Sequence, residues 1–265
     1  MAKKDYLWLN LRELPYFRAF LRAIEGRFYE EFEMPGPILD LGCGDGSFAS
    51  ITFDKPLDVG IDPWVGPIHK AVKTHAYNLV VQGDGHQMPF PDGSFGSAMI
   101  NSVLEHIPDL QPVLVDVSRV LCPGGFFYFC VPNHQFLSNL SIARFFDRLK
   151  FKGLAKAYRA FFNKIARHYH CDDPETWKKN LEAAGFEVVE WWHYFSPEAL
   201  AVLEWGHYFG LPSAMTHILF RKWILSPARW NQAITRRIVE KYYTEDPKTP
   251  RGTCTFYIAR KKTAQ

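Results

Sequence analysis

A glycine-rich run contains the first residues that could do chemistry. It reads Asp40-Leu41-Gly42-Cys43-Gly44-Asp45-Gly46 and ends a short apolar segment, 38–41. Glycines at alternate positions let a turn adopt positive φ and approach a ligand closely. Dinucleotide sites have the spacing Gly-x-Gly-x-x-Gly, but here Ser47 stands in place of the third glycine. The run therefore predicts a ligand-binding turn and disfavours an oxidoreductase, while an ordinary tight turn is the alternative for the run alone.

Two acidic residues stand at the ends of the next apolar segments. Asp62 ends the segment 57–62, and Asp84 follows the segment 79–82. A carboxylate at the first position can accept hydrogen bonds from both hydroxyls of a ribose. A carboxylate at the second position can accept one from the exocyclic amine of adenine. Together with the glycine run, these residues predict a ligand that contains adenosine and needs no phosphate cradle.

The elements that must position these residues alternate between strand and helix. Strands are predicted at 38–41, 57–62, 79–82, 95–101, 126–131, 186–192 and 253–259, and helices at 64–76, 110–121 and 174–184. Such alternation predicts an α/β fold with a doubly wound, mostly parallel sheet. We expect a turn at Pro123-Gly124-Gly125, and Gly185 to end the last of these helices.

The composition is that of a globular protein, because 47% of the 265 residues are hydrophobic and 22% are charged. No apolar run approaches the roughly 18–20 residues of a membrane-spanning helix, and we expect no signal peptide. The five cysteines form no CxxC pair, which favours a cytoplasmic location. We expect a helical cap over 1–35 and one domain over 36–265, with helical insertions at about 135–170 and 197–245.

Five motifs occur in order: LDLGCGDG, VGID, GDGHQMPFPDGSFG, INSVLEHIPD and RVLCPGGFFYFCVPN. They resemble those of the class I S-adenosylmethionine-dependent methyltransferases, most closely the small-molecule methyltransferases of type 11. The resemblance covers 36–134 closely and 171–195 more loosely. It implies a Rossmann-like sheet of seven strands, six parallel and the last antiparallel. It also implies S-adenosyl-L-methionine as the cofactor.

The resemblance implies a set of cofactor-binding residues. They are Asp40, Gly42, Cys43, Gly44, Asp62, Asp84, Gly85 and Asn101. The residues of the glycine run would surround the methionine end, and Asp62 would hold the ribose. Asp84 and Gly85 would meet the adenine, and Asn101 would lie beneath the methyl donor.

Two histidines are candidate general bases for an oxygen or carbon acceptor. His106 follows the fourth predicted strand and His134 follows the fifth, near the strand ends where such sheets bind ligands. A capping or surface role is the alternative for each. Methyltransferases that act on amino groups of nucleic acids carry Asn-Pro-Pro-Tyr after the fourth strand, whereas this chain has Asn101-Ser102-Val103-Leu104. We therefore expect a small or lipid-like acceptor and no nucleic acid.

The run His168-Tyr169-His170-Cys171-Asp172-Asp173 raises the possibility of a metal site. A helix N-terminus explains its acidic end better, because Asp173 stands before Pro174 as a cap does before a proline at the first helical position. We expect no metal here.

Two segments are strongly basic in an otherwise acidic chain. Residues 135–170 hold eight Lys or Arg and one acid, and 217–241 hold six and one, whereas 36–134 hold four and ten. Both segments are also rich in large aliphatic and aromatic residues, as are helices at an anionic membrane surface. The alternative is that both cover the acceptor site as a lid. The oligomeric state is left open.

We expect methyl transfer from S-adenosyl-L-methionine to a small or lipophilic acceptor, at oxygen or carbon. The alternative is a non-catalytic partner subunit that binds the cofactor on the same fold. The expected location is the cytoplasm, with possible peripheral contact with a membrane.

Overall fold

The computed structural model describes residues 4–220 and 222–263, which group into two compact units. Unit 1 combines the N-terminal segment up to Glu31 with 135–165 and 193–253. Unit 2 consists of 32–134, 166–192 and the chain from Cys254 onward. The N-terminal segment and most of both insertions therefore belong to one unit. The division into a cap and a single domain that we expected stays a prediction.

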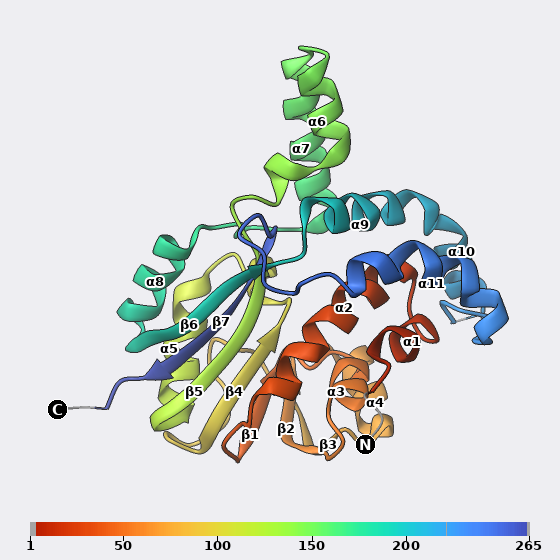
Figure 1. Cartoon of the computed structure of the whole chain (residues 1–265). Coiled ribbons are helices and arrows are strands. Elements are labelled where there is room, and N and C mark those ends of the chain that lie inside the picture. The colour runs from red at the N-terminus through yellow and green to blue at the C-terminus, as the bar shows by residue number, and fades with distance from the viewer. Residues whose placement is uncertain (1–3, 221, 264–265) are drawn as a thin grey trace. The chain divides into compact units, whose positions relative to one another are not determined.

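A seven-stranded sheet forms the centre of unit 2 (Figure 1). Its strands are β1 (Ile38–Leu41), β2 (Leu57–Asp62), β3 (Tyr77–Gln82), β4 (Phe95–Asn101), β5 (Leu121–Pro132), β6 (Phe186–Tyr194) and β7 (Cys254–Lys261). They lie in the order β3-β2-β1-β4-β5-β7-β6. Neighbours from β3 to β5 pair in parallel, while β7 runs antiparallel to β5. The α/β fold class with a mostly parallel sheet is confirmed.

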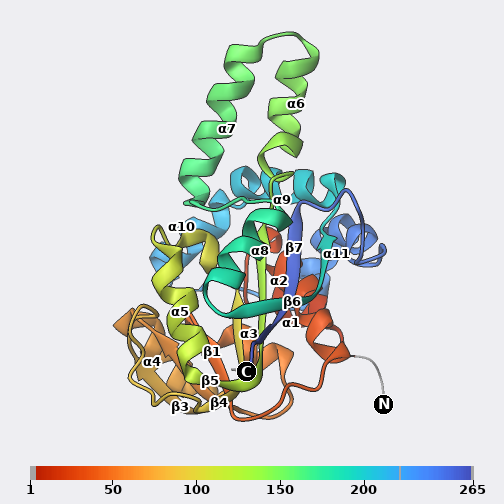
Figure 2. The ribbon, with the colours of Figure 1, turned by 90° about the vertical axis from the view of Figure 1, so that its left-hand side faces the viewer.

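The helices of unit 2 cover the sheet and build its core. They are α3 (Ser47–Thr52), α4 (Val65–Thr74), the short 3₁₀ helix η2 (Leu104–His106), α5 (Leu110–Val120) and α8 (Pro174–Ala183). Alternate residues of β1, β4, β5 and β7 share one apolar core with α5 and α8. Asp173 accepts a hydrogen bond from the Thr176 N–H at 2.9 Å and caps α8, as we predicted. Figure 2 shows α5 and α8 as neighbours.

Our prediction of a turn at Pro123–Gly125 was wrong. These residues belong to β5, which begins at Leu121. Phe95 of β4 pairs with Leu121 but Ser97 pairs with Phe126, so the intervening residues of β5 bulge out of the ladder. Gly124 has φ +79 there, a conformation that glycine adopts without steric cost. A bulge and a turn use the same residue types, so the local pattern could not separate them.

Unit 1 is helical. It contains α1 (Tyr6–Leu11), α2 (Tyr16–Phe28), η1 (Tyr29–Glu31), η3 (Leu137–Asn139), α6 (Ser141–Arg148), α7 (Lys152–Ala166), α9 (Pro197–Phe209), α10 (Leu211–Phe220) and α11 (Arg229–Tyr243). A buried hydrogen bond of 2.7 Å joins the Tyr194 hydroxyl to the Glu25 carboxylate on α2. Arg236 of α11 binds Asp5 at 2.8 Å. Segments far apart in the sequence are thus held together by polar contacts within the unit.

Replacing Trp177 of α8 tests the unit 2 core, because this side chain is 0% exposed and its ring centre lies 5.1 Å from that of Phe129. We expect Trp177→Ala to lower the free energy of unfolding by about 3–5 kcal/mol, as large buried aromatics do when truncated. Trp64→Ala is the matched control, since Trp64 is 71% exposed and should change stability by less than about 0.5 kcal/mol. Urea unfolding followed by circular dichroism measures both. Equal midpoints for the two variants would contradict this description of the core.

Candidate functional site

The loop after β1 is an open turn of the backbone. Gly42, Gly44 and Gly46 have φ of +78, +57 and +75, all in the region that favours glycine. A Cβ on Gly42 would lie 2.7 Å from the Val103 side chain, whereas one on Gly44 would meet nothing within 4 Å. Packing therefore requires glycine at position 42. At position 44 the backbone faces open space that a ligand can enter.

Asp62, at the end of β2, holds this loop. Its Oδ2 accepts a hydrogen bond from the Gly44 N–H at 3.0 Å, and its Oδ1 accepts one from the Trp64 N–H at 2.9 Å. The residue is only 6% exposed. A carboxylate has about four lone-pair positions, so both oxygens can still accept from further donors. The structure thus brings Asp62 and Gly44 together, as a shared cofactor site requires.

Asp40 accepts a hydrogen bond of 2.6 Å from the Tyr77 hydroxyl of β3. Burial raises the pKa of Tyr77, and the Asp40 charge adds to the effect, so the phenol stays a donor. Burial, followed by the charges of Asp40 and Asp62, also raises the pKa of Cys43. Sequence reasoning missed Tyr77, because it does not stand in a motif and only strand pairing brings it to Asp40.

The loop after β3 presents Asp84 to solvent and buries Gly85. Asp84 Oδ1 accepts hydrogen bonds from the backbone N–H and the ring Nδ1 of His86. These bonds lower the pKa of Asp84 and raise that of His86. The carboxylate therefore stays ionised, with an imidazolium favoured beside it. His86 was not among the predicted site residues, although it stands two positions after Asp84.

Arg119 of α5 holds the same loop through hydrogen bonds and ion pairs. Its guanidinium donates to the carbonyl of Phe90 at 2.7 Å and to that of Met88 at 2.9 Å. It also pairs with Asp92 at 2.9 Å and with Asp116 at 2.7 Å. Asp116 accepts the Met88 N–H at 2.7 Å in turn. Sequence reasoning missed this clamp, because its partners in the loop lie 27 to 31 residues before Arg119.

The end of β4 has an unusual backbone. Asn101 Oδ1 accepts a hydrogen bond from the thiol of Cys130 on β5 at 3.1 Å. Ser102, the next residue, has φ +53, which is uncommon for a residue with a side chain. Such conformations cluster at functional sites, where surrounding contacts maintain them. This turn places Val103 against Gly42, so the loops after β1 and β4 are packed together.

Both candidate bases follow strands that pair with each other, β4 and β5, and both are exposed. His106 Nδ1 lies 3.0 Å from the carbonyl oxygen of Arg167. A carbonyl only accepts, so Nδ1 carries the proton in this contact and the neutral ring has its lone pair on Nε2. The ring centre of His168 lies 5.5 Å from that of His106. A catalytic role for His106 or His134 stays a prediction.

The histidines and cysteine of the run 168–173 have structural contacts. His170 Nε2 donates to the carbonyl of Ile107 at 3.0 Å, and its Nδ1 lies 3.2 Å from Asp172. Burial, above all, raises the pKa of Cys171 to about 12, which leaves its thiol protonated. Within 4–220 and 222–263, no group of three His, Cys, Asp or Glu side chains is arranged to hold a metal ion.

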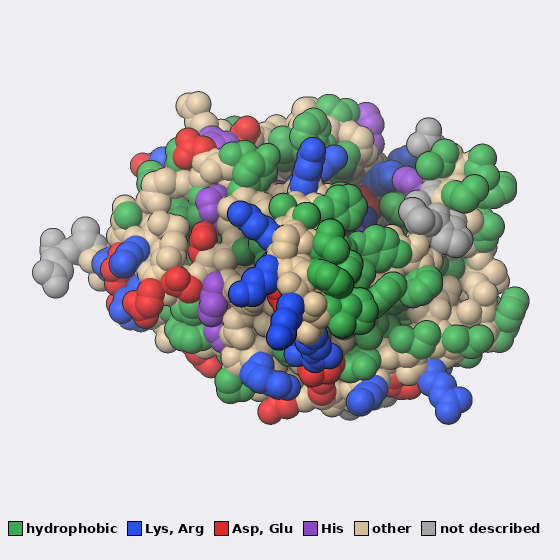
Figure 3. Space-filling model, turned by 90° about the horizontal axis from the view of Figure 1, so that it is seen from above, with side chains coloured by type: hydrophobic (Ala, Val, Ile, Leu, Met, Phe, Trp, Pro, Cys, Tyr) green, Lys and Arg blue, Asp and Glu red, His purple; other side chains and the backbone are tan. Residues whose placement is uncertain are grey.

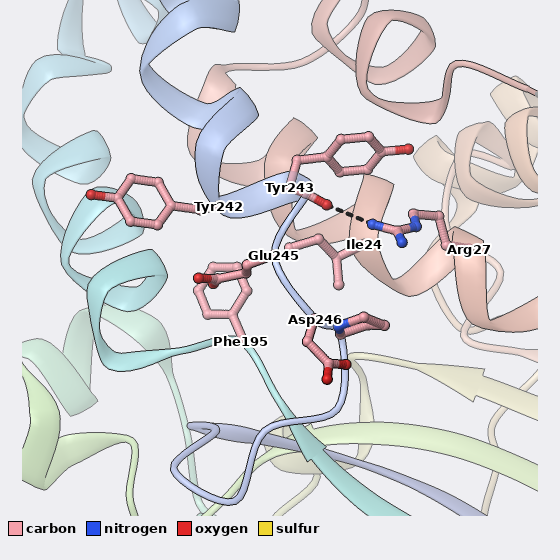
Figure 4. A pocket seen from close by; sticks show the side chains of 8 residues that line it. Ile24, Arg27, Phe195, Tyr242, Tyr243, Glu245 and Asp246 are labelled. Atoms are coloured by element: carbon pink, nitrogen blue, oxygen red, sulfur yellow. Dashed lines mark hydrogen bonds between the residues drawn. The ribbon is translucent and has the colours of Figure 1, made fainter.

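Among the residues that the structure describes, unit 1 contains hollows of different size. One of about 10 Å³ lies between α2 and the end of α11 (Figure 4), room for about one water molecule. Arg27 donates to the Tyr243 carbonyl across it at 2.5 Å. The other, of about 430 Å³, is lined by Trp8, Arg229, Gln232, Ala233, Arg236, Arg237 and Glu240. Three of the residues that line the second hollow are arginines, and Arg236 among them is paired with Asp5 and Glu240.

Residues 39–129 match the family model of a methyltransferase domain. Over 98 residues the chain is 37% identical to a fatty-acid O-methyltransferase of Mycolicibacterium smegmatis, and the aligned residues make up 35% of each protein. Over 119 residues it is 33% identical to a ubiquinone/menaquinone biosynthesis C-methyltransferase of Stutzerimonas stutzeri, and the aligned residues make up 42% of this chain and 45% of that protein. The match thus spans less than half the length of either relative.

A solved structure extends the likeness beyond the matched segment. It is a SAM-dependent methyltransferase of Thermotoga maritima, described as a possible histamine N-methyltransferase, with a TM-score of 0.55 over 93% of this chain and 91% of that one. Its sequence is 16% identical, so it shows a shared fold and nothing about the acceptor.

The Asp84–His86 contact makes a pH-dependent prediction. We expect NMR titration to place the pKa of His86 above the ordinary value of about 6.5, because the Asp84 carboxylate stabilises the imidazolium. As pH rises through that raised pKa, the ring loses its proton and the ionic part of the contact. Asp84→Asn should return the pKa towards the ordinary value. The control Asp92→Asn, in the same loop, should leave it raised, and equal pKa values in the two variants would refute the assignment.

Proposed function

We propose that this chain, whose residues 39–129 match a methyltransferase domain, is a class I S-adenosylmethionine-dependent methyltransferase, and that it transfers a methyl group from S-adenosyl-L-methionine to a small lipophilic acceptor. The Asp62–Gly44 contact is the observation that carries the proposal. It places a buried carboxylate with spare lone pairs beside a turn whose backbone is open at Gly44. The site thus fits a cofactor that presents two ribose hydroxyls.

The cofactor supplies an electrophilic methyl group on a sulfonium, so the protein must mainly orient it and its acceptor. We assign the ribose to Asp62, the adenine to Asp84 and Gly85, and the methionine end to the glycine loop with Asp40. Asn101, fixed by Cys130, is assigned a place beneath the methyl donor. His106 can take a proton from the acceptor at Nε2, because its Nδ1–H is held by the Arg167 carbonyl.

The lipophilic acceptor is supported by the relatives. One is named for methylation of fatty acids at oxygen, and the other for methylation at carbon in quinone biosynthesis. Both names describe acceptors with large apolar parts, and neither describes methylation at nitrogen. We therefore propose an oxygen or carbon acceptor for this chain as well.

We further propose that the protein works in a reducing compartment and contacts a membrane surface there. All five cysteines are free thiols, which suits a reducing environment. Among the described residues, none of the helices has both the length and the apolarity to cross a bilayer. Contact with a membrane would therefore be peripheral.

Replacing Asp62 tests the cofactor site. We expect Asp62→Ala to weaken S-adenosyl-L-methionine binding by about 1–3 kcal/mol, because charge-assisted bonds to the ribose are lost. Asp54→Ala, at an exposed position, is the control and should bind as the unmodified protein does. Isothermal calorimetry measures the affinity, and circular dichroism verifies folding. Equal affinities for both variants would remove Asp62 from the site.

Methyl transfer itself is tested with a labelled methyl donor and acceptors that carry carboxyl, phenol or activated carbon groups on an apolar chain. We expect label in the organic phase, and a methyl ester would release its label on mild alkaline hydrolysis whereas a C-methyl group would not. His106→Gln should slow transfer by about 10²–10⁴-fold, as loss of a general base does, while cofactor affinity stays the same. Tight cofactor binding with no transfer to any acceptor would favour a non-catalytic partner subunit.

A further inference from the structure

The turn between α6 and α7 exposes basic and apolar side chains in alternation. We call residues 148–154 the hairpin tip, and all seven are exposed. Its sequence is Arg148-Leu149-Lys150-Phe151-Lys152-Gly153-Leu154. The apolar members Leu149, Phe151 and Leu154 are 49%, 55% and 53% exposed. Large apolar side chains that gather in this way mark an interaction surface.

The apolar surface continues down both helices from the tip. On α6, Phe145 is 56% exposed and stands four residues before Leu149. On α7, Phe161 and Ile165 are 50% and 44% exposed, seven and eleven residues after Leu154. These spacings place each set on one side of its helix. Seen from above, hydrophobic side chains gather over the hairpin beside Lys and Arg side chains (Figure 3).

The hairpin is held firmly at its base. The buried Glu204 of α9 accepts the N–H groups of Ser141 and Ile142, at 2.5 and 3.2 Å, at the start of α6. The hydroxyls of Tyr158 on α7 and Tyr208 on α9 lie 2.8 Å apart. Within unit 1, Figures 1 and 2 show α6 and α7 projecting from α9 up to the tip. The base therefore packs on the unit while the tip extends away from it.

The tip also has a defined conformation. The N–H of Lys150 donates to the Asp147 carbonyl, and that of Phe151 donates to the Phe146 carbonyl, both at 2.9 Å. Lys150 has φ +63, so α6 ends in a left-handed residue whose neighbours satisfy its last carbonyls. The order in which apolar and basic groups emerge is thus set by the backbone. A surface that binds them need not order the chain first.

The charges identify what this surface fits. Residues 135–170 hold eight basic residues and one acid, Asp147, and Asp147 is paired with Arg159. The lysines of the tip flank Phe151 on both sides. Lys and Arg lay their apolar stems along a bilayer surface and keep their charges among the headgroups, while apolar neighbours enter the acyl boundary. Binding to a nucleic acid would not account for three exposed apolar side chains in seven residues.

We propose that the hairpin tip inserts into the interface of a membrane containing anionic lipids and anchors the protein there. The apolar side chains supply insertion, and the lysines and arginines supply attraction to the headgroups. α7 has 15 residues, too few to cross the roughly 30 Å core of a bilayer, so the contact is interfacial. Anchoring does not depend on methyl transfer and can be tested apart from it.

The test uses the full chain and flotation with vesicles of phosphatidylcholine alone or with phosphatidylserine added. We expect binding to the anionic vesicles only, with release as salt rises, because exposed charges are screened. Replacing Lys150, Lys152 and Lys156 with Gln should weaken binding about ten- to a hundredfold, since each basic residue near an anionic surface contributes. The matched control replaces Lys70, Lys178 and Lys179 with Gln, three exposed lysines of unit 2, and should retain binding.

A second variant separates insertion from charge. Replacing Leu149, Phe151 and Leu154 with Ser should lower binding to the anionic vesicles, although the net charge is unchanged. In a hydrogen-exchange measurement, vesicles should protect the backbone amides of the tip in the unmodified protein and leave those of this variant unprotected. The proposal rests on the membrane contact proposed above, but both variants should bind S-adenosyl-L-methionine normally, so the outcome is independent of the proposed methyl transfer. Equal binding to neutral and anionic vesicles, equal losses in the lysine variant and its control, or no binding at all would each overturn the proposal.

Discussion

The carboxylate of Asp62 is the contact on which the candidate site depends. One oxygen accepts the N–H of Gly44 and the other accepts that of Trp64, so a single side chain fixes the glycine loop and the entry to α4. A hydrogen bond to a charged group contributes about 1.5–3 kcal/mol, and Asp62 makes two such bonds with these backbone N–H groups. The Gly44 backbone is therefore held in place while open space remains beside it. The residue that shapes the loop is also the one assigned to the cofactor ribose.

Each neighbouring loop at this edge of the sheet is held by a different interaction. Arg119 and Asp116 clamp the loop that carries Asp84. The left-handed Ser102 turns Val103 onto Gly42. Cys43 in the glycine loop is unreactive. Burial raises its pKa and keeps it a thiol, and a thiol is a far weaker nucleophile than a thiolate. Such surroundings suit a reaction in which the cofactor supplies the reactive group.

Unit 1 differs from unit 2, because polar contacts hold the base of its α6–α7 hairpin while exposed apolar side chains lie along its helices. Glu204 and Tyr208 secure the hairpin, and exposed apolar residues also follow a four-residue spacing on α11, at Trp230, Ile234 and Ile238. The two proposals thus concern different units. Unit 2 carries the residues assigned to the cofactor, and unit 1 carries the surfaces that suit contact with lipid.

The sequence by itself determined the α/β fold, the strand positions of the sheet and the Asp173 cap of α8. These depend on short-range patterns: apolar runs of strand length, glycines after a strand, and an acid before a proline. The motifs also indicated the family, because their order along the chain reflects the order of strands in the fold. The bulge in β5 was mistaken for a turn, since both use proline and glycine at the same positions.

Only the tertiary structure decided which distant residues meet. Tyr77 of β3 reaches Asp40 of β1 across Gly60 of the intervening strand β2, where a side chain would meet its ring, and no local pattern encodes that arrangement. The same holds for the clamp of Arg119 and for the proton position on His106, which is set by a carbonyl 61 residues away. The grouping of the N-terminal helices with both insertions is also tertiary, because buried contacts such as Glu25 to Tyr194 span 169 residues. Side-chain contacts across such separations arise from packing, and periodicity along the chain does not record them.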